Sequence, residues 1–257
     1  MTTPIEQHNL EIHENRKGWD RKPSLRFVYG EFYREIGRRI RRDVAGEVVE
    51  LGSGLGNTKT FLPGCITTDI FPNPWIDRVE DAYRLNFAAG SISNLILFDV
   101  WHHLEFPGTA LREFRRVLAP GGRVIVFDPA MGWIGKFVFG LFHHEPLGLK
   151  NPIRWEAPEG SDPAEFPYYA AQGNASRIFG SGKFQRELTG WRIKEVTYLS
   201  GLAYVATGGF RGPQVAPDWL IRGLHRADQT FSKWRFLASR MLVVLEPESG
   251  DDEKRPC

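Results

Sequence analysis

The chain has 257 residues and a formal net charge of +2, with 42% hydrophobic and 25% charged residues. This length suits one α/β domain with a substantial core, and the nearly balanced charge argues for no particular partner. Its two cysteines exclude a disulfide scaffold, and no apolar run approaches the length needed to cross a bilayer. We therefore expect a globular protein of the cytoplasm.

The two ends of the chain differ from its middle. Residues 1–22 are polar and contain no apolar core of a signal peptide, and residues 246–257 are rich in acidic and other charged side chains. We expect both segments to be mobile, which leaves 23–245 as a single domain. Leu25, Val28, Phe32, Ile36 and Ile40 recur at helical spacing and predict an amphipathic helix ahead of the first strand.

Residues 48–57, VVELGSGLGN, combine a short apolar run with a glycine-rich turn. Glycines there permit positive φ and let the backbone approach a bound molecule closely. Glu50 precedes Gly52 by two residues, where a carboxylate would repel a pyrophosphate and attract an ammonium group. The spacing also departs from the dinucleotide fingerprint, because Asn57 stands where its third glycine belongs. The pattern predicts a loop for a cationic small molecule.

Further acids follow short predicted strands. Residues 65–69 predict a second strand that ends in Asp69, where a carboxylate typically binds both ribose hydroxyls of an adenosine. Asp81 precedes an apolar pair and would accept a hydrogen bond from an adenine amino group. Asn94–Phe98 predicts a fourth strand, which is followed directly by Asp99.

The remaining elements follow from periodicity and from helix-stopping glycines and prolines. The thirty residues after position 144 are rich in proline, glycine and aromatic residues, which is typical of a lid or binding loop. We therefore expect a lid or substrate insertion at about 131–175. The predicted elements are a helix at Ala110–Leu118, a strand at Arg123–Phe127, an aromatic helix at Met131–Phe142, a helix at Ala175–Leu188, a strand at Trp191–Leu199, a helix around Asp218–Trp234 and a strand at Arg240–Leu245.

Five motifs in this order resemble the class I S-adenosylmethionine-dependent methyltransferases of the small-molecule, type 11-like kind, over about residues 44–128. They are ELGSGLG (50–56), Asp69, DAYRLNF (81–87), DVWHHL (99–104) and EFRRVLAPGGRVIV (113–126). The resemblance implies an α/β fold: a Rossmann-like, doubly wound seven-stranded sheet, mostly parallel with an antiparallel last strand, and helices on both faces. It implies S-adenosyl-L-methionine as cofactor. TDIFPNPWID (68–77) and LFHHEP (141–146) resemble a bacterial group without an assigned substrate.

The resemblance also implies roles for the cofactor residues. Glu50 and the glycine turn would hold the methionine end, Asp69 the ribose, and Asp81 with Ala82 the adenine, while Asp99 would lie near the sulfonium. The expected cofactor-binding residues are Glu50, Gly52, Ser53, Gly54, Asp69, Ile70, Asp81, Ala82, Asp99 and Val100.

Candidates for catalysis are histidines, because a base helps methyl transfer when the acceptor must lose a proton. His102 and His103 follow the fourth strand at the edge where α/β sheets bind ligands, and His144 begins the expected lid. The pair at 102–103 can equally cap the strand. Neighbouring histidines also suggest a metal, but no H-E-x-x-H or Cys/His spacing accompanies them, so we predict no metal site.

Trp155, Tyr168 and Tyr169 would contact an apolar or sugar-like acceptor, or else pack in the core. We predict S-adenosylmethionine-dependent methyl transfer to a small-molecule, sugar or lipid-like acceptor, at oxygen. Aminopropyl transfer from the decarboxylated cofactor and a non-catalytic cofactor-binding partner subunit are the alternatives. We expect no nucleic-acid partner, a monomer or homodimer, and at most a weak membrane-surface contact through the aromatic helix.

Overall fold

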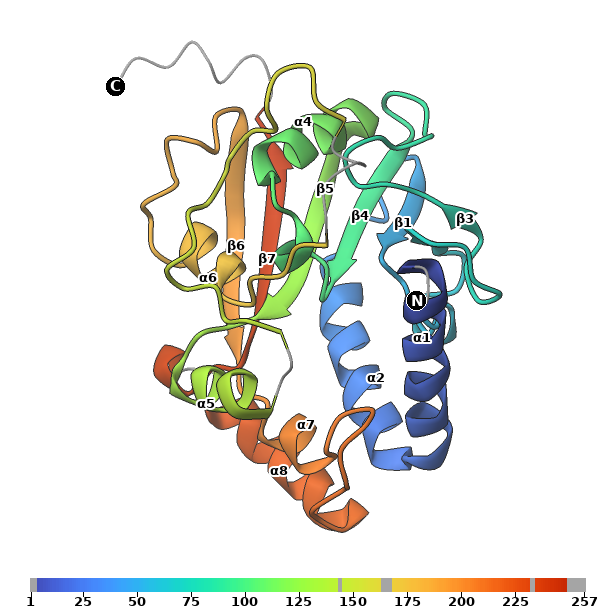
Figure 1. Ribbon diagram of the computed structural model, residues 1–257, viewed down its shortest axis with the longest axis vertical. Coiled ribbons are helices and arrows are strands. Elements are labelled where there is room, and N and C mark those ends of the chain that lie inside the picture. The colour runs from blue at the N-terminus through green and yellow to red at the C-terminus, as the bar shows by residue number, and fades with distance from the viewer. Residues whose placement is uncertain (1–3, 143–144, 163–167, 232–233, 249–257) are drawn as a thin grey trace.

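The computed structural model describes residues 4–142, 145–162, 168–231 and 234–248. A seven-stranded sheet lies at its centre, with the strand order β3-β2-β1-β4-β5-β7-β6 (Figure 1). Neighbouring strands from β3 to β5 pair in parallel, and β7 pairs antiparallel with both β5 and β6. The strands are β1 (Glu47–Leu51), β2 (Ile66–Asp69), β3 (Arg78–Val79), β4 (Ile92–Phe98), β5 (Leu118–Pro129), β6 (Trp191–Leu199) and β7 (Arg240–Pro247). The predicted seven-stranded sheet and its antiparallel last strand are confirmed.

Helices cover both faces of the sheet. Because side chains alternate along a strand, Leu95 and Leu97 of β4 pack into one core with α4 and α6, and Ile96 and Phe98 pack into a second core with α2 and α7. The helices are α1 (Pro4–Arg21), α2 (Pro23–Gly37), α3 (Thr58–Phe61), α4 (Pro107–Val117), α5 (Trp133–Phe142), α6 (Asn174–Phe179), α7 (Leu202–Ala206) and α8 (Asp218–Phe231), with 3₁₀ turns η1 (Trp101–His103) and η3 (Arg235–Leu237).

The strand order reverses between β1 and β4. β2 and β3 continue from β1 in one direction, and β5 continues from β4 in the other. The loops after β1 and β4 therefore diverge at the carboxyl edge of the sheet, which is where open α/β sheets bind their ligands. The fold thus brings the glycine turn and the two histidines to one place.

One prediction about secondary structure is wrong. The helix expected at Ala175–Leu188 ends at Phe179, because Gly180 and Gly182 follow and Gly182 has a φ of 70°. Residues 1–22 were expected to be a mobile segment, yet Pro4–Arg21 forms α1. Ile12 and Trp19, seven residues apart on one helix face, are buried, and this spaced pair anchors a helix that is otherwise polar.

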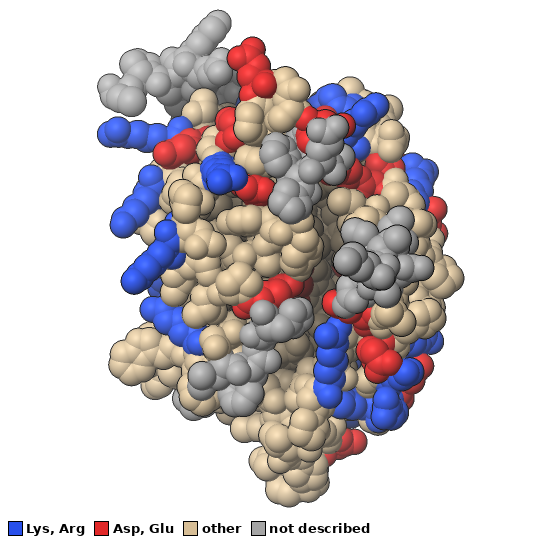
Figure 2. Space-filling model, in the orientation of Figure 1, with Lys and Arg blue, Asp and Glu red and all other residues tan. Residues whose placement is uncertain are grey.

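Figure 2 shows the face of the molecule that carries the carboxyl edge. It is hollowed between the half that bears β6 and α6 and the half that bears α1, and acidic side chains line the walls of this groove. None of the helices within the described residues combines the length and the apolar character that crossing a bilayer demands.

Candidate functional site at the carboxyl edge of the sheet

The loop after β1 has its three glycines in the left-handed region, as predicted. Gly52, Gly54 and Gly56 have φ values of 65°, 50° and 63°, which residues with a Cβ rarely adopt. A Cβ on Gly52 would lie 2.4 Å from Val100 Cγ2, and one on Gly56 would lie 2.3 Å from the carbonyl oxygen of Trp75. A Cβ on Gly54 would meet nothing within 4 Å, so the loop leaves open space beside its backbone at that point.

Asp69, at the end of β2, is bonded to this loop. Its Oδ2 accepts the backbone N–H of Gly54 at 2.9 Å, and its Oδ1 accepts the N–H of Ile70 at 2.8 Å. Ser53 joins the same two segments, because its N–H donates to the carbonyl of Thr68 at 2.7 Å. The carboxylate predicted to bind ribose therefore lies beside the loop predicted to bind the methionine end.

Glu50 is buried, with 1% of its surface exposed. Its Oε1 lies 3.3 Å from the hydroxyl of Tyr33, and its Oε2 accepts the hydroxyl of Thr58. Burial raises the pKa of Glu50 to about 7, although these hydrogen bonds oppose the rise. In this structure Glu50 ties the glycine loop to α2 and α3, and its contact with the cofactor stays a prediction.

The segment predicted to hold adenine forms a tight turn. Asp81 Oδ1 accepts the N–H of Tyr83 at 2.8 Å, and burial raises the pKa of Asp81. Ala82 is partly buried against the core. The hydroxyl of Tyr83 accepts the N–H of Phe106 at 3.1 Å, which fixes this turn to the start of α4.

Helix α1 also contributes to this site, which the polar sequence of residues 1–22 did not indicate. His8 Nε2 lies 3.4 Å from Asp69 Oδ1, and the His8 ring packs edge-on against Phe71 at 5.1 Å. Asn9 donates to the carbonyl of Pro72 at 3.4 Å. Burial alone would lower the pKa of His8, but the hydrogen bond and charge of Asp69 raise it. The helix thus covers the carboxylate that was predicted to bind ribose.

Asp99 follows β4 with a φ of 56°, and it is the one residue other than glycine with a positive φ among those described. Such a conformation persists where the surrounding structure enforces it. Asp99 Oδ1 accepts from Nη1 of Arg240, a buried residue of β7 whose guanidinium lies 4.9 Å from the ring centre of Tyr204. The charge of Asp99 holds the pKa of Arg240 above its usual value despite burial. Nothing in the apolar, β-branched pattern of β7 indicated this partner.

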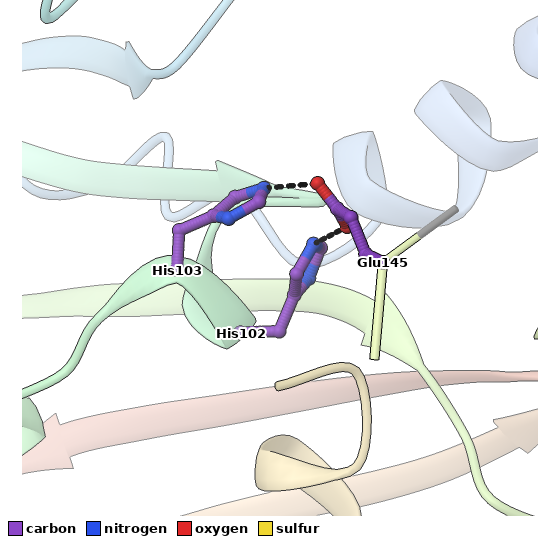
Figure 3. A group of neighbouring side chains, drawn as sticks. All are labelled: His102, His103 and Glu145. Carbon is purple, nitrogen blue, oxygen red and sulfur yellow. Dashed lines mark ion pairs between the residues drawn. The ribbon is translucent and has the colours of Figure 1, made fainter. Parts of the chain in front are cut away.

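The two histidines of η1 converge on a carboxylate from the insertion (Figure 3). His102 Nδ1 lies 2.9 Å from Asp128 Oδ1, and His103 Nδ1 lies 3.0 Å from the carbonyl oxygen of Tyr169. On the other side of the rings, His102 Nε2 is 3.5 Å from Glu145 Oε2, and His103 Nε2 is 3.8 Å from Glu145 Oε1. We call His102, His103 and Glu145 the histidine–glutamate cluster.

The groups of this cluster have displaced pKa values. Burial alone would lower the pKa of His102, but the charge and hydrogen bond of Asp128 raise it to about 10. Burial and the neighbouring charge of His102 lower the pKa of His103 to about 4. Burial opposes ionisation of Glu145, yet the two histidines hold its pKa below the usual range. Strongly displaced pKa values of this kind are typical of functional sites.

Two further side chains of the insertion hold Glu145. The hydroxyl of Tyr168 donates to its Oε1, and Nε2 of Gln172 donates to its Oε2. The Tyr168 ring lies 5.2 Å from that of His103 and is 75% exposed. Tyr168 and Tyr169 therefore lie at the cluster, and their contact with an acceptor stays a prediction.

Trp155 and His144 complete the residues predicted for the acceptor side. Trp155 stacks on Phe184 at 6.2 Å, and its backbone oxygen accepts the N–H of Gly108 in α4. This arrangement favours the packing role for Trp155. His144 lies outside the described residues.

A family model described as a methyltransferase domain matches residues 49–126. The match begins in β1, contains the glycine loop, Asp69, Asp81 and both histidines, and ends in β5. The sheet around it has β7 antiparallel between β5 and β6, as the resemblance implied. Residues 49–126 therefore form a methyltransferase domain, which supports the S-adenosylmethionine-dependent methyltransferase that the resemblance implied. The cofactor of this methyltransferase is S-adenosyl-L-methionine.

Solved structures are similar to this methyltransferase at low identity. A SAM-dependent methyltransferase from Archaeoglobus fulgidus is 11% identical over 86% of this chain and 93% of its own, with a TM-score of 0.49. Geranyl diphosphate methyltransferase in complex with SAM is 11% identical over 85% of each chain, with a TM-score of 0.45. A protein from Methanococcus maripaludis, provisionally named a SAM-dependent methyltransferase, is 18% identical over 49% of this chain and 66% of its own, with a TM-score of 0.40. No curated protein matches the chain. The structural likenesses at this low identity do not define an acceptor.

Proposed function

We propose that this methyltransferase methylates a hydroxyl oxygen of a small-molecule, sugar or lipid-like acceptor. The observation that carries the proposal is the histidine–glutamate cluster. It lies at the carboxyl edge of the sheet, and its two histidines come shortly after Asp99. A hydroxyl group is a poor nucleophile until its proton is removed. Displacement at a sulfonium otherwise needs mainly alignment of acceptor, carbon and sulfur, so imidazoles beside a carboxylate suit an acceptor that must be deprotonated.

For the cofactor we propose the crevice between the loops after β1 and β4. The hydrogen bond between Gly54 and Asp69, and the open space beside Gly54, support this position. His8 would give up its contact with Asp69 when the ribose hydroxyls arrive. The proposed cofactor-binding residues are those predicted from the sequence: Glu50, Gly52, Ser53, Gly54, Asp69, Ile70, Asp81, Ala82, Asp99 and Val100.

On the acceptor side we propose that the insertion at about 131–175 binds the acceptor and presents it to the cluster. His103 supports this role, because its side chain is 29% exposed whereas that of His102 is 4% exposed. With a pKa lowered to about 4, His103 is a neutral imidazole at physiological pH, so it has an unprotonated ring nitrogen. Tyr168 and Glu145 lie within reach of the same position.

An exposed aromatic patch beside the insertion supports an acceptor with an apolar part. The patch consists of Trp133 and Phe137 on α5 with Trp234 and Phe236 around η3, and each of the four exposes at least half of its surface. Trp133 and Phe236 are in ring contact at 6.0 Å. Large exposed aromatic groups are typical of surfaces that bind apolar ligands, membranes or other proteins. The patch would therefore also suit weak binding to a membrane surface or to a second copy of the chain.

The experiment uses the full-length protein, S-adenosylmethionine with a labelled methyl group, and acceptors matched in pairs. Phenol is compared with aniline, and methyl glucoside and octyl glucoside with octylamine. We expect label in the hydroxyl compounds, as ethers that survive mild alkali, and a lower KM for octyl than for methyl glucoside. Transfer to the amines alone would contradict oxygen methylation. Calorimetry with decarboxylated S-adenosylmethionine and with NAD as a control tests the aminopropyl alternative separately.

A further inference from the structure

The three donor groups of the histidine–glutamate cluster are spaced as ligands around an ion (Figure 3). The Nε2 atoms of His102 and His103 lie 3.5 Å and 3.8 Å from oxygens of Glu145, and one ligand atom from each of the three residues lies within 4.8 Å of the others. Hydrogen bonds between such groups close to about 2.7–3.2 Å. Ligands bonded at about 2.1 Å in a tetrahedral site are about 3.4 Å apart, which is close to the spacing found here.

Both imidazoles are oriented by partners on their other nitrogen. His102 Nδ1 faces Asp128 Oδ1 at 2.9 Å, and His103 Nδ1 faces the carbonyl oxygen of Tyr169 at 3.0 Å. An oxygen acceptor at each Nδ1 places an N–H there, so Nε2, which faces Glu145, is the nitrogen of each ring that can bind an ion. Histidines that bind metals almost always donate their second N–H to a carboxylate or a backbone carbonyl in this manner.

The surroundings of the cluster have an excess of acceptors and of negative charge. Among the described residues, Asp128 Oδ2 and Gln172 Oε1 are buried without a hydrogen-bond partner, and both residues contact the cluster. Three carboxylates, on Asp99, Asp128 and Glu145, are accompanied by one guanidinium, that of Arg240. An ion that binds Nε2 of His102 displaces the proton there, and with both imidazoles neutral the three carboxylates and one guanidinium leave two negative charges for a divalent cation to balance. Buried charge of this kind is costly unless it is paired.

We propose that His102, His103 and Glu145 bind a divalent first-row transition metal ion, with Zn²⁺ as the reference ion. Mixed imidazole and carboxylate donors suit Zn²⁺ and its neighbours better than Mg²⁺ or Ca²⁺, which prefer oxygen ligands alone. Three protein ligands leave a position open, as in catalytic zinc sites. The open position takes the acceptor oxygen, and the ion then takes over the activating role that a free His103 imidazole would have.

The step that follows rests on the proposed function. The ion lowers the pKa of the bound hydroxyl, and the O–H proton passes to solvent. A lone pair of the oxygen forms the new O–C bond while the C–S bond breaks and its electrons return to sulfur. The products are the methyl ether, neutral S-adenosylhomocysteine and one proton, so no oxidant or reductant is required.

Metal binding is tested without cofactor or acceptor, so its outcome is independent of the proposed function. Full-length protein is stripped with a chelator, and Zn²⁺ is titrated against a fluorescent chelator, with the bound metal counted by elemental analysis. We expect one Zn²⁺ per chain and a Kd below 1 µM. Glu145→Gln and His103→Asn should weaken binding at least 100-fold, and Asp128→Asn, which acts through His102, about tenfold. His225→Asn, which removes a partly buried histidine near Glu31 on another surface, should leave binding unchanged.

Circular dichroism and thermal melting show whether each variant is folded, and Co²⁺ provides a second readout. Co²⁺ bound at the cluster should give visible absorption that is lost in Glu145→Gln. Stoichiometric Zn²⁺ that binds equally well to folded Glu145→Gln and His103→Asn would overturn the site, as would the absence of binding at 10 µM Zn²⁺. If the metal binds as expected but its removal leaves methyl transfer unchanged, the ion-binding part stands and the activating role is refuted.

Discussion

The cofactor region of this methyltransferase (residues 47–104) and its insertion (about 131–175) are built in different ways. In the cofactor region the backbone does most of the positioning, through three left-handed glycines and an Asp69 carboxylate bonded to two backbone N–H groups. The insertion contributes side chains, and Glu145 meets histidines about forty positions earlier in the chain. The family match ends at residue 126, before the insertion begins. The proposed cofactor site is thus built mainly from neighbouring residues of the chain, whereas the proposed acceptor site depends on tertiary contacts.

The largest effect on the cofactor region is expected from Asp69→Asn. The change removes the charge that the ribose hydroxyls would bond, and hydrogen bonds to a charged group are worth about 1.5–3 kcal/mol. We expect the Kd for S-adenosylmethionine, measured by calorimetry, to rise about 100-fold. Asp43→Asn removes an exposed carboxylate paired with Arg41 and serves as control. An unchanged Kd in Asp69→Asn would refute the assigned role even though the fold stands.

Glu50→Gln separates stability from binding. The folded pKa of Glu50 is raised from 4.5 to about 7, so the native state holds this proton more tightly than the unfolded chain does. Stability therefore falls as pH rises from about 4.5 through 7, and glutamine, which never ionises, escapes that loss. In urea unfolding we expect Glu50→Gln to gain about 2 kcal/mol at pH 8 and little at pH 5, with weaker cofactor binding. A destabilised variant at pH 8 would show that the ionised carboxylate is needed by the loop.

Gly54→Ala tests the open space beside the loop. Gly54 and Gly90 both have positive φ, and a Cβ at either meets nothing within 4 Å. Alanine at either position should therefore cost about 1 kcal/mol of stability through backbone strain. We expect only Gly54→Ala to weaken cofactor binding, by about tenfold, because its methyl group enters the space proposed for the cofactor. Equal affinities in the two variants would place the cofactor elsewhere.

Tyr168→Phe tests the insertion alone. It removes one hydrogen bond to Glu145, worth about 1 kcal/mol. In steady-state kinetics we expect kcat/KM for the acceptor to fall about five- to tenfold, with the Kd for S-adenosylmethionine unchanged. Tyr198→Phe is the matched control: Tyr198 lies in β6, and its ring is beside Arg235 of η3. A loss of cofactor affinity in Tyr168→Phe would break the separation between the two regions.

The smallest expected effect on cofactor affinity comes from the contact between His8 of α1 and Asp69. The pKa of His8 is raised by Asp69, so the contact is strongest below pH 6.5 and is lost as pH rises through the raised pKa. Since the ribose would displace His8 from Asp69, we expect the Kd for S-adenosylmethionine to fall about threefold between pH 6 and pH 9. His8→Gln should remove this dependence. His13→Gln, on the same helix but against Trp75, should retain it.

The contrast between the two regions also explains how much of the fold and of the site could be predicted from the sequence. The glycine turn, Asp69 and β4 are strings of neighbouring residues whose backbone requirements show directly in the sequence. Glu145 was visible only as a charged residue at the end of an aromatic helix, and no ligand spacing linked it to the histidines of η1. Arg240 lies in a strand whose pattern indicates nothing but burial, and α1 depends on Ile12 and Trp19 within a polar helix. Contacts between distant segments leave no periodic trace, so these parts required the structure.

The Asp99–Arg240 pair has a consequence for the order in which the enzyme becomes competent during synthesis. A growing chain that has left the ribosome only as far as α8 already contains the whole family match and every member of the histidine–glutamate cluster. Asp99 nevertheless has no guanidinium to hold its left-handed backbone until Arg240 arrives, and Arg240 arrives only when β7 inserts between β5 and β6. The contact that holds the left-handed backbone of Asp99 is therefore completed by the last strand of the sheet to be synthesised.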